Sequence, residues 1–144
     1  MRLAMKFYAV ALVIPLQLAS VTQAVADSID TLSLELNSVQ DVGSACRLTF
    51  LAKNMTGTAI DKAVFETVIF DGTGGVVSLK LFDFRDLPMK RPRVRQFDLS
   101  NMSCQEVGQA LINGASTCLV SGAESDLCQS ALILKSRVDV ELLG

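Results

Sequence analysis

The stretch KAVFETVIFDGTGGVVSLKLF, residues 62–82, joins two apolar segments through a glycine-rich turn. After Lys62, residues 62–70 are apolar on both faces except at Glu66 and Thr67, which is typical of a central strand that is covered on both sides. Aliphatic and polar residues alternate in the second segment, as they do in a strand with one face in a core. Because Asp71-Gly72 between two apolar runs is a hairpin signal, we expect the two segments to pair as antiparallel strands.

The same period of two residues continues along most of the chain and predicts further strands. These are expected over residues 31–37, 46–53, 93–99, 107–118 and 130–142. Residues 54–60 are predicted to be a turn, with Asn54 and Gly57 suited to positive φ. A turn of helix or a loop is expected around Cys104. In the last segment one face is aliphatic, and its residues are Leu132, Leu134, Val138, Val140 and Leu142.

About seven short strands predict an all-β fold: a two-sheet, antiparallel, immunoglobulin-like sandwich, with one short helix near Cys104. The Cys…Trp…Cys signature of antibody domains is absent, because the chain has no tryptophan. The expected fold is therefore the architecture and not the antibody family.

Residues 1–26 have the layout of a secretory signal peptide. Arg2 and Lys6 precede an apolar run from Phe7 to Leu18, and Ala24-Val25-Ala26 is a small-x-small cleavage site. An uncleaved membrane anchor is the alternative interpretation. Cleavage after Ala26 would leave residues 27–144 as a single domain of 118 residues, without a transmembrane segment, in the periplasm or secreted.

Four cysteines behind a signal peptide indicate two disulfides formed in an oxidising compartment. If residues 107–118 and 130–142 are neighbouring antiparallel strands, Cys118 and Cys128 flank the loop between them, which favours their pairing. Cys46 would then pair with Cys104. Another pairing stays open, and a four-thiolate metal site is a weaker alternative because no C-x-x-C spacing occurs.

The stretch FLAKNMTGTAIDKAVFETVIFDGTGGVV, residues 50–77, resembles the core of exported FxLYD-type domains. Phe70-Asp71 stands where that family has Tyr-Asp, Gly75 precedes a valine pair as in the family, and Asn54 follows the second strand. The whole chain, with its cysteines and RVRQFDLSNMSC, is also similar to signal-bearing periplasmic proteins of alphaproteobacteria. These resemblances imply a sandwich module in the periplasm and no catalytic residue.

The chain contains no histidine, which removes histidine-based nucleophilic and general-base catalysis and nearly all catalytic zinc sites. Glu66 is the one carboxylate in a strongly apolar strand, and it is interpreted as an edge-facing residue in preference to a buried, shifted acid. We therefore expect no catalytic residue, no metal site and no cofactor. A nucleic-acid partner is not expected, because the chain is acidic overall and exported.

The segment MKRPRVRQFDLS, residues 89–100, is the positive region of a chain whose formal net charge is −2. In a regular strand its arginines would share a face with the core residues Phe97 and Leu99. We expect this conflict to be resolved by a sheet edge or a bulge before Phe97. The candidate partner-binding residues are Lys90, Arg91, Arg93 and Arg95. Charges and proline at an edge also prevent strand-to-strand aggregation, so a purely structural role is the alternative.

Three functions remain in view. The first is a non-enzymatic periplasmic module that binds an envelope protein or an anionic surface. The second is a thiol–disulfide redox protein that uses a strained Cys118–Cys128 loop. The third is a structural subunit of an envelope assembly that accepts a partner's strand at an unpaired edge. The oligomeric state is not predicted by the sequence.

Overall fold

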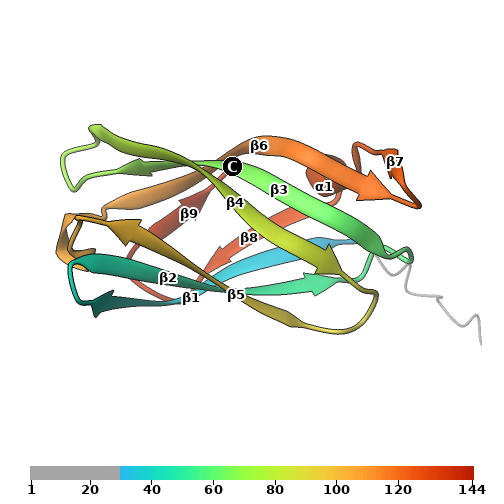
Figure 1. The fold of residues 1–144 in the computed structure, drawn as a ribbon, viewed down its shortest axis with the longest axis horizontal. Helices are drawn as coiled ribbons and strands as arrows, with labels where there is room; N and C mark the ends of the chain where they lie inside the picture. Colours follow the sequence, from blue (N-terminus) through green and yellow to red (C-terminus); the bar gives the residue numbers. More distant parts are fainter. Residues whose placement is uncertain (1–29) are drawn as a thin grey trace, which may run out of the picture.

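A computed structural model describes residues 30–144, which form two β-sheets packed face to face (Figure 1). The predicted signal peptide, residues 1–26, lies outside the described residues. The elements are β1 (Leu32–Val42), β2 (Ala45–Asn54), β3 (Ile60–Phe70), β4 (Val76–Leu87), β5 (Arg93–Ser100), the 3-10 turn η1 (Cys104–Glu106), β6 (Gln109–Val120), β7 (Ala123–Glu124), α1 (Leu127–Ser130), β8 (Leu132–Ser136) and β9 (Glu141–Leu143).

One sheet has the strand order β5-β2-β1-β8, and the other has the order β4-β3-β6-β7 with β9 paired to β6. The predicted two-sheet sandwich and the short helical turn at Cys104 are thus confirmed. The sheets are mixed, because β1 pairs with β8 and β6 pairs with β9 in parallel. The prediction of an entirely antiparallel sandwich was wrong in these two pairs.

The hairpin predicted over residues 62–82 is formed by β3 and β4. The carboxylate of Asp71 accepts hydrogen bonds from the backbone N–H groups of Thr73 and Gly75 and from the Thr73 hydroxyl, which closes the turn. As expected, β3 is a central strand, since it pairs with β4 on one side and β6 on the other. Glu66 is therefore not at an edge: it is half-buried on the outer face of the sheet, where its carboxylate accepts a hydrogen bond from Asn113.

The last segment differs most from its prediction. Residues 130–142 do not form one strand beside β6. They divide into β8, which joins the first sheet, and β9, which joins the second. The break is a tight turn in which the Ser136 hydroxyl contacts the carbonyls of Val138 and Val140. The aliphatic face still points inward along the whole segment, because the chain crosses between the sheets with one side toward the core.

Aromatic rings from both sheets meet in the core. Phe50 on β2 makes edge-to-face contacts with Phe82 and Phe84 on β4 and with Phe97 on β5. Phe82 and Phe97 stack with ring centroids 4.1 Å apart. Such contacts join strands of different sheets and add to the burial of apolar surface.

Both disulfides have the favoured pairing: Cys46 with Cys104, and Cys118 with Cys128. The first ties β2 to η1. The second ties β6 to α1. The predicted pairing of Cys118 with Cys128 was therefore right, but the predicted reason, two neighbouring antiparallel strands joined by a loop, was wrong.

Candidate functional site

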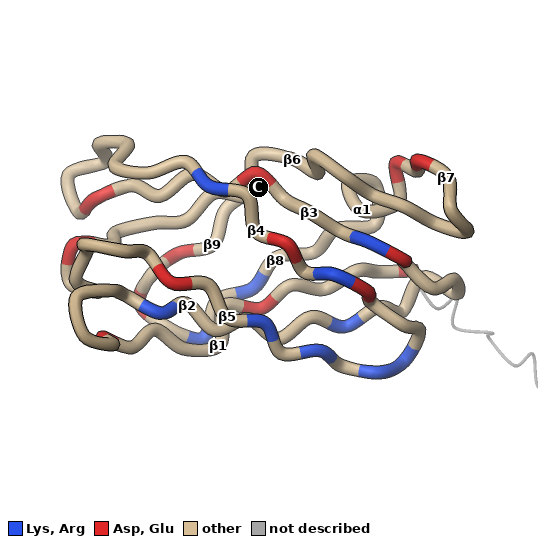
Figure 2. Tube along the Cα trace, viewed as in Figure 1, with Lys and Arg blue, Asp and Glu red and all other residues tan. Residues whose placement is uncertain are grey.

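The basic segment forms the turn between β4 and β5 and then enters β5 (Figure 2). Lys90 and Arg91 are exposed in the turn. Lys90 has a φ of 58°, and its backbone N–H donates to the carbonyl of Asn54 at 2.9 Å. Two of the four predicted partner-binding side chains are therefore presented to solvent from a turn that is anchored on the end of β2.

Arg95 has an internal role. Its guanidinium donates hydrogen bonds to the carbonyl oxygens of Phe84, Asp86 and Val94, at 2.7, 3.2 and 3.2 Å. Phe84 and Asp86 belong to β4 and Val94 to β5, and these are the end strands of the two sheets. With 18% of its side chain exposed, Arg95 closes the side of the sandwich and satisfies carbonyls at both free edges.

Arg93 reinforces this contact. It donates to the Asp86 carboxylate at 3.2 Å, and Arg95 approaches the same group at 3.4 Å. The hydrogen bond from Arg93 lowers the pKa of Asp86, and the positive charges of Arg93 and Arg95 add to the effect. The structure thus separates the four predicted residues into an exposed pair, Lys90 and Arg91, and an internally bonded pair.

The β5 strand contains no bulge. Its register with β2 is unbroken from Arg93 to Ser100. Arg93 and Arg95 therefore do share a face of the strand with Phe97. The predicted sheet edge is correct and the alternative of a bulge in β5 is wrong. The irregularity lies instead in β4, where Arg85 has a φ of 60° and the register with β3 shifts.

A pocket of about 570 Å3 opens beside Lys90 at this end of the molecule. It is lined by Asp30, Thr31, Asn54, Met55, Gly57, Met89 and Lys90. Met55 and Met89 are large apolar side chains that are 49% and 44% exposed. We call the group formed by Met55, Met89, Lys90 and Arg91 the loop-end site.

Asn54 is the buried residue that holds the backbone of this site in place. Its side chain donates to the carbonyls of Thr58 and Leu87 and accepts from the N–H and hydroxyl of Thr56. It lacks the positive φ predicted for it and is instead a buried connector, while Gly57 has the expected positive φ of 78°. Asn54 therefore holds the β2–β3 turn against the end of β4.

Sequence reasoning missed the two methionines as members of the site. They lie 34 positions apart in two different turns, and an isolated methionine in a turn carries no local signal. Their proximity follows from the isolated bridge between Asn54 and Met89, which places the two turns side by side.

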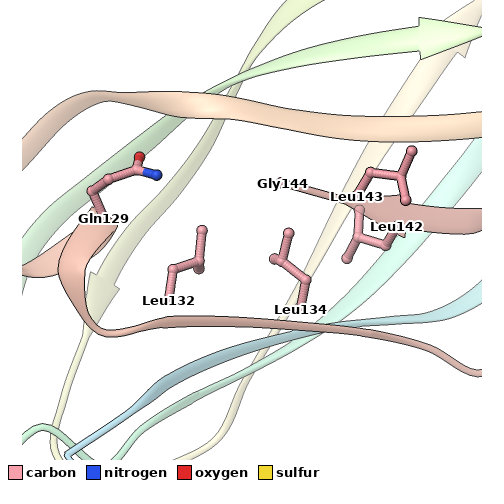
Figure 3. A pocket seen from close by; sticks show the side chains of 6 residues that line it. All are labelled: Gln129, Leu132, Leu134, Leu142, Leu143 and Gly144. Carbon is pink, nitrogen blue, oxygen red and sulfur yellow. The ribbon is translucent and has the colours of Figure 1, made fainter.

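A second hollow, of about 480 Å3, lies on the side of the sandwich formed by β8 and β9. Figure 3 shows Leu132 and Leu134 pointing from β8 toward the opposite sheet, with Leu142 on β9 and Gln129 on α1. The Gln129 side-chain oxygen accepts the backbone N–H of Ala115 at 3.3 Å. Among the described residues, no titratable side chain lines this hollow.

The cysteines relevant to a redox function are buried: 3% of Cys118 and 0% of Cys128 are exposed. Within residues 30–144, no group of three or more His, Cys, Asp or Glu residues is placed to hold a metal ion. In the same range no helix is long and apolar enough to cross a membrane.

The two packed sheets and two disulfides define the class of protein: a disulfide-bonded β-sandwich of the kind found outside the cytoplasm. A solved structure described as the structural characterization of IrmA from Escherichia coli is similar to it, with a TM-score of 0.60. The two chains are 14% identical, and the match covers 73% of this chain and 91% of that one, so the likeness concerns the fold alone. No family model and no curated protein matches this sequence, and the resemblance to FxLYD-type domains stays a prediction.

Proposed function

We propose that the protein is a non-enzymatic periplasmic module that binds an anionic envelope partner through the loop-end site. One observation carries the proposal: two exposed methionines and two exposed basic residues gather at one end of the sandwich. Loops at the end of a rigid sandwich are a common place for recognition, because the sheets hold them in position.

The chemistry of the partner follows from the side chains. Lys90 and Arg91 favour a carboxylate or a phosphate, and Met55 and Met89 offer flexible apolar surface to a neighbouring aliphatic group. Asp30 also lines the pocket, so the positive charge lies on the β4–β5 turn and not around the whole rim. An acidic protein segment with an apolar residue beside its carboxylates fits this arrangement.

The redox alternative has less support from the geometry. Thiol–disulfide exchange requires that an attacking thiolate reach a sulfur atom, and both sulfurs of the Cys118–Cys128 bridge belong to buried residues. A structural role for these bonds, as ties between β-strands and short helical segments, accounts for their positions.

The test compares two double variants with equal charge change. Lys90→Gln with Arg91→Gln removes the exposed pair, and Lys135→Gln with Arg137→Gln removes two exposed charges on and after β8. Binding is measured to immobilised envelope proteins and to phosphatidylglycerol vesicles, at low and high salt. Each basic contact contributes about 1 kcal/mol at an anionic surface, so the first variant should bind more than tenfold more weakly.

The control should bind as the unchanged protein does. Equal binding by both variants and the unchanged protein would remove the loop-end site from consideration. Preference for immobilised protein over vesicles, lost when Met55 and Met89 are replaced by Ser, would identify the partner as a protein segment.

A further inference from the structure

The β4 strand has one guarded half and one open half. It is the last strand of its sheet, and within residues 30–144 no strand pairs with its other edge. Arg95 bonds the carbonyls of Phe84 and Asp86 in its C-terminal half. The N-terminal half, residues 76–81, begins at the β3–β4 turn, and the hydrogen bonds of Arg95 to β4 go to Phe84 and Asp86 outside this half.

The open half is unusually apolar for an exposed edge. The exposed fractions are 63% for Val76, 43% for Val77, 58% for Leu79 and 60% for Leu81. Lys80 is the one charged residue in this half-strand. Edge strands are normally protected by several charges, by proline, by a bulge or by a covering element. In this half-strand Lys80 is the one protecting charge, so a mostly apolar edge is left to pair with another strand.

The apolar surface continues across the outer face of the sheet. Leu79 pairs with Val68 on β3, Val68 with Leu111 on β6, and Leu111 with Leu143 on β9. These four residues form one row of aliphatic side chains that begins at the open edge. A strand added beside β4 would extend the row by cross-strand contacts.

We propose that the open half of β4 pairs with the same half-strand of a second copy of this chain, antiparallel and about a two-fold axis. A two-fold contact requires a surface that is complementary to itself. Residues 76–81 meet this condition when Leu79 lies on the axis, because Val77 then faces Leu81 of the second copy and Ser78 faces its Lys80.

Charge selects this register over the adjacent one. With Lys80 on the axis, the two lysines would lie directly opposite each other, which destabilises a strand pair. With Leu79 on the axis, each lysine faces a serine. The two-fold contact thus joins aliphatic side chains on the outer face and places no like charges in direct opposition.

The size of the contact predicts its strength. Six residues at about 3.4 Å each span about 20 Å, and an edge about 10 Å high gives a contact far smaller than the roughly 800 Å2 per partner of a standard interface. We therefore expect a reversible dimer with a Kd in the micromolar range and not an obligate one.

The first experiment is sedimentation velocity of the disulfide-bonded protein from about 1 µM to about 1 mM, a range that brackets micromolar affinity. The unchanged protein should pass from monomer to dimer. Leu79→Lys places two lysines on the axis and should shift the midpoint at least tenfold upward in concentration. Ile133→Lys is the matched control, because Ile133 is 41% exposed on β8, the end strand at the far edge of the other sheet, and it should leave the midpoint unchanged.

The second experiment tests the register. Leu79→Cys should form an intermolecular disulfide on mild oxidation, because directly opposed residues of an antiparallel pair have Cα atoms about 4.5 to 5.5 Å apart, within the range of a disulfide. Ile133→Cys should not, because Ile133 lies on β8, away from the edge of β4. Circular dichroism of each variant confirms that it is folded.

Three outcomes would overturn the proposal. The first is a monomer at every concentration, and the second is a dimer whose midpoint Leu79→Lys leaves unchanged. The third is intermolecular cross-linking that is as efficient in the Ile133→Cys variant as in the Leu79→Cys variant. None of these outcomes bears on the loop-end site, which is formed by other residues at the opposite end of β4.

Discussion

At the scale of single residues, the buried polar side chains are of two kinds. Two of them stabilise the fold through hydrogen bonds, and one weakens it. Asn54 and Thr56 are buried, and their side chains are hydrogen-bonded to each other or to backbone groups. Thr67 is fully buried on β3, and its hydroxyl has no hydrogen-bond partner within residues 30–144. A buried hydroxyl without a partner loses its bonds to water and gains nothing in return.

Replacing Thr67 by Val should therefore stabilise the protein. Valine keeps the β-branched shape and the β-propensity while removing the unpaired hydroxyl, and we expect the free energy of unfolding to rise by about 1 kcal/mol. Urea unfolding followed by circular dichroism measures it. Thr49→Val is the control, because the Thr49 hydroxyl accepts a hydrogen bond from Gln96, and it should give no gain. Destabilisation by Thr67→Val would mean that the hydroxyl is bonded after all.

At the scale of elements, the disulfides compensate for short and irregular segments. Cys104 lies in a three-residue 3-10 turn and Cys128 in a four-residue helix, and neither element is long enough to be stable alone. Each bridge ties its segment to a long strand, β2 or β6. The two bridges close loops of very different length, with sequence separations of 58 and 10 residues.

The longer loop should matter more for stability. In the chain-entropy description, a cross-link stabilises by restricting the unfolded chain, by about 4 kcal/mol for the Cys46–Cys104 loop and about 3 kcal/mol for the Cys118–Cys128 loop. Replacing each pair by two alanines, and measuring unfolding in urea, tests this order. A larger loss from the shorter loop would show that native-state packing around α1, and not chain entropy, dominates.

At the scale of the whole molecule, carboxylates link the strands electrostatically. Asp98 on β5 forms a two-pronged contact with Arg47 on β2, at 2.7 and 2.8 Å, and this hydrogen bonding lowers the pKa of Asp98. Asp86 on β4 has a lowered pKa through Arg93 on β5. One contact lies within a sheet and the other joins the two sheets.

These shifts predict loss of stability in acid. A carboxyl group with a lowered pKa in the folded state binds fewer protons there than in the unfolded chain, so its contribution is present above the ordinary value of 3.8. That contribution is lost as the pH falls through the lower, folded value. Urea midpoints from pH 7 to about pH 3 should decline below about pH 4, and less steeply in a variant with Asp86→Asn and Asp98→Asn. An equal decline in both proteins would assign the acid sensitivity to other groups. Because both pairs are exposed, salt should reduce the difference.

The alternation of residues along the chain was sufficient to predict the two-layer fold, the β3–β4 hairpin and the inward faces, since side chains in a strand alternate over neighbouring positions. The positions of the cysteines beside the expected strands favoured both disulfides, and the clustering of positive charge drew attention to Lys90, Arg91, Arg93 and Arg95. The sheet that each half of residues 130–142 joins, the partners of Arg93 and Arg95, and the meeting of Met55 with Met89 were decided by the tertiary structure. The partners of the arginines and the meeting of the methionines depend on contacts between segments that are distant in the sequence. The division of residues 130–142 depends on the direction of a turn, which the local alternation of residues does not indicate. A residue's face is a local property of the backbone, whereas its partner depends on how the sheets pack.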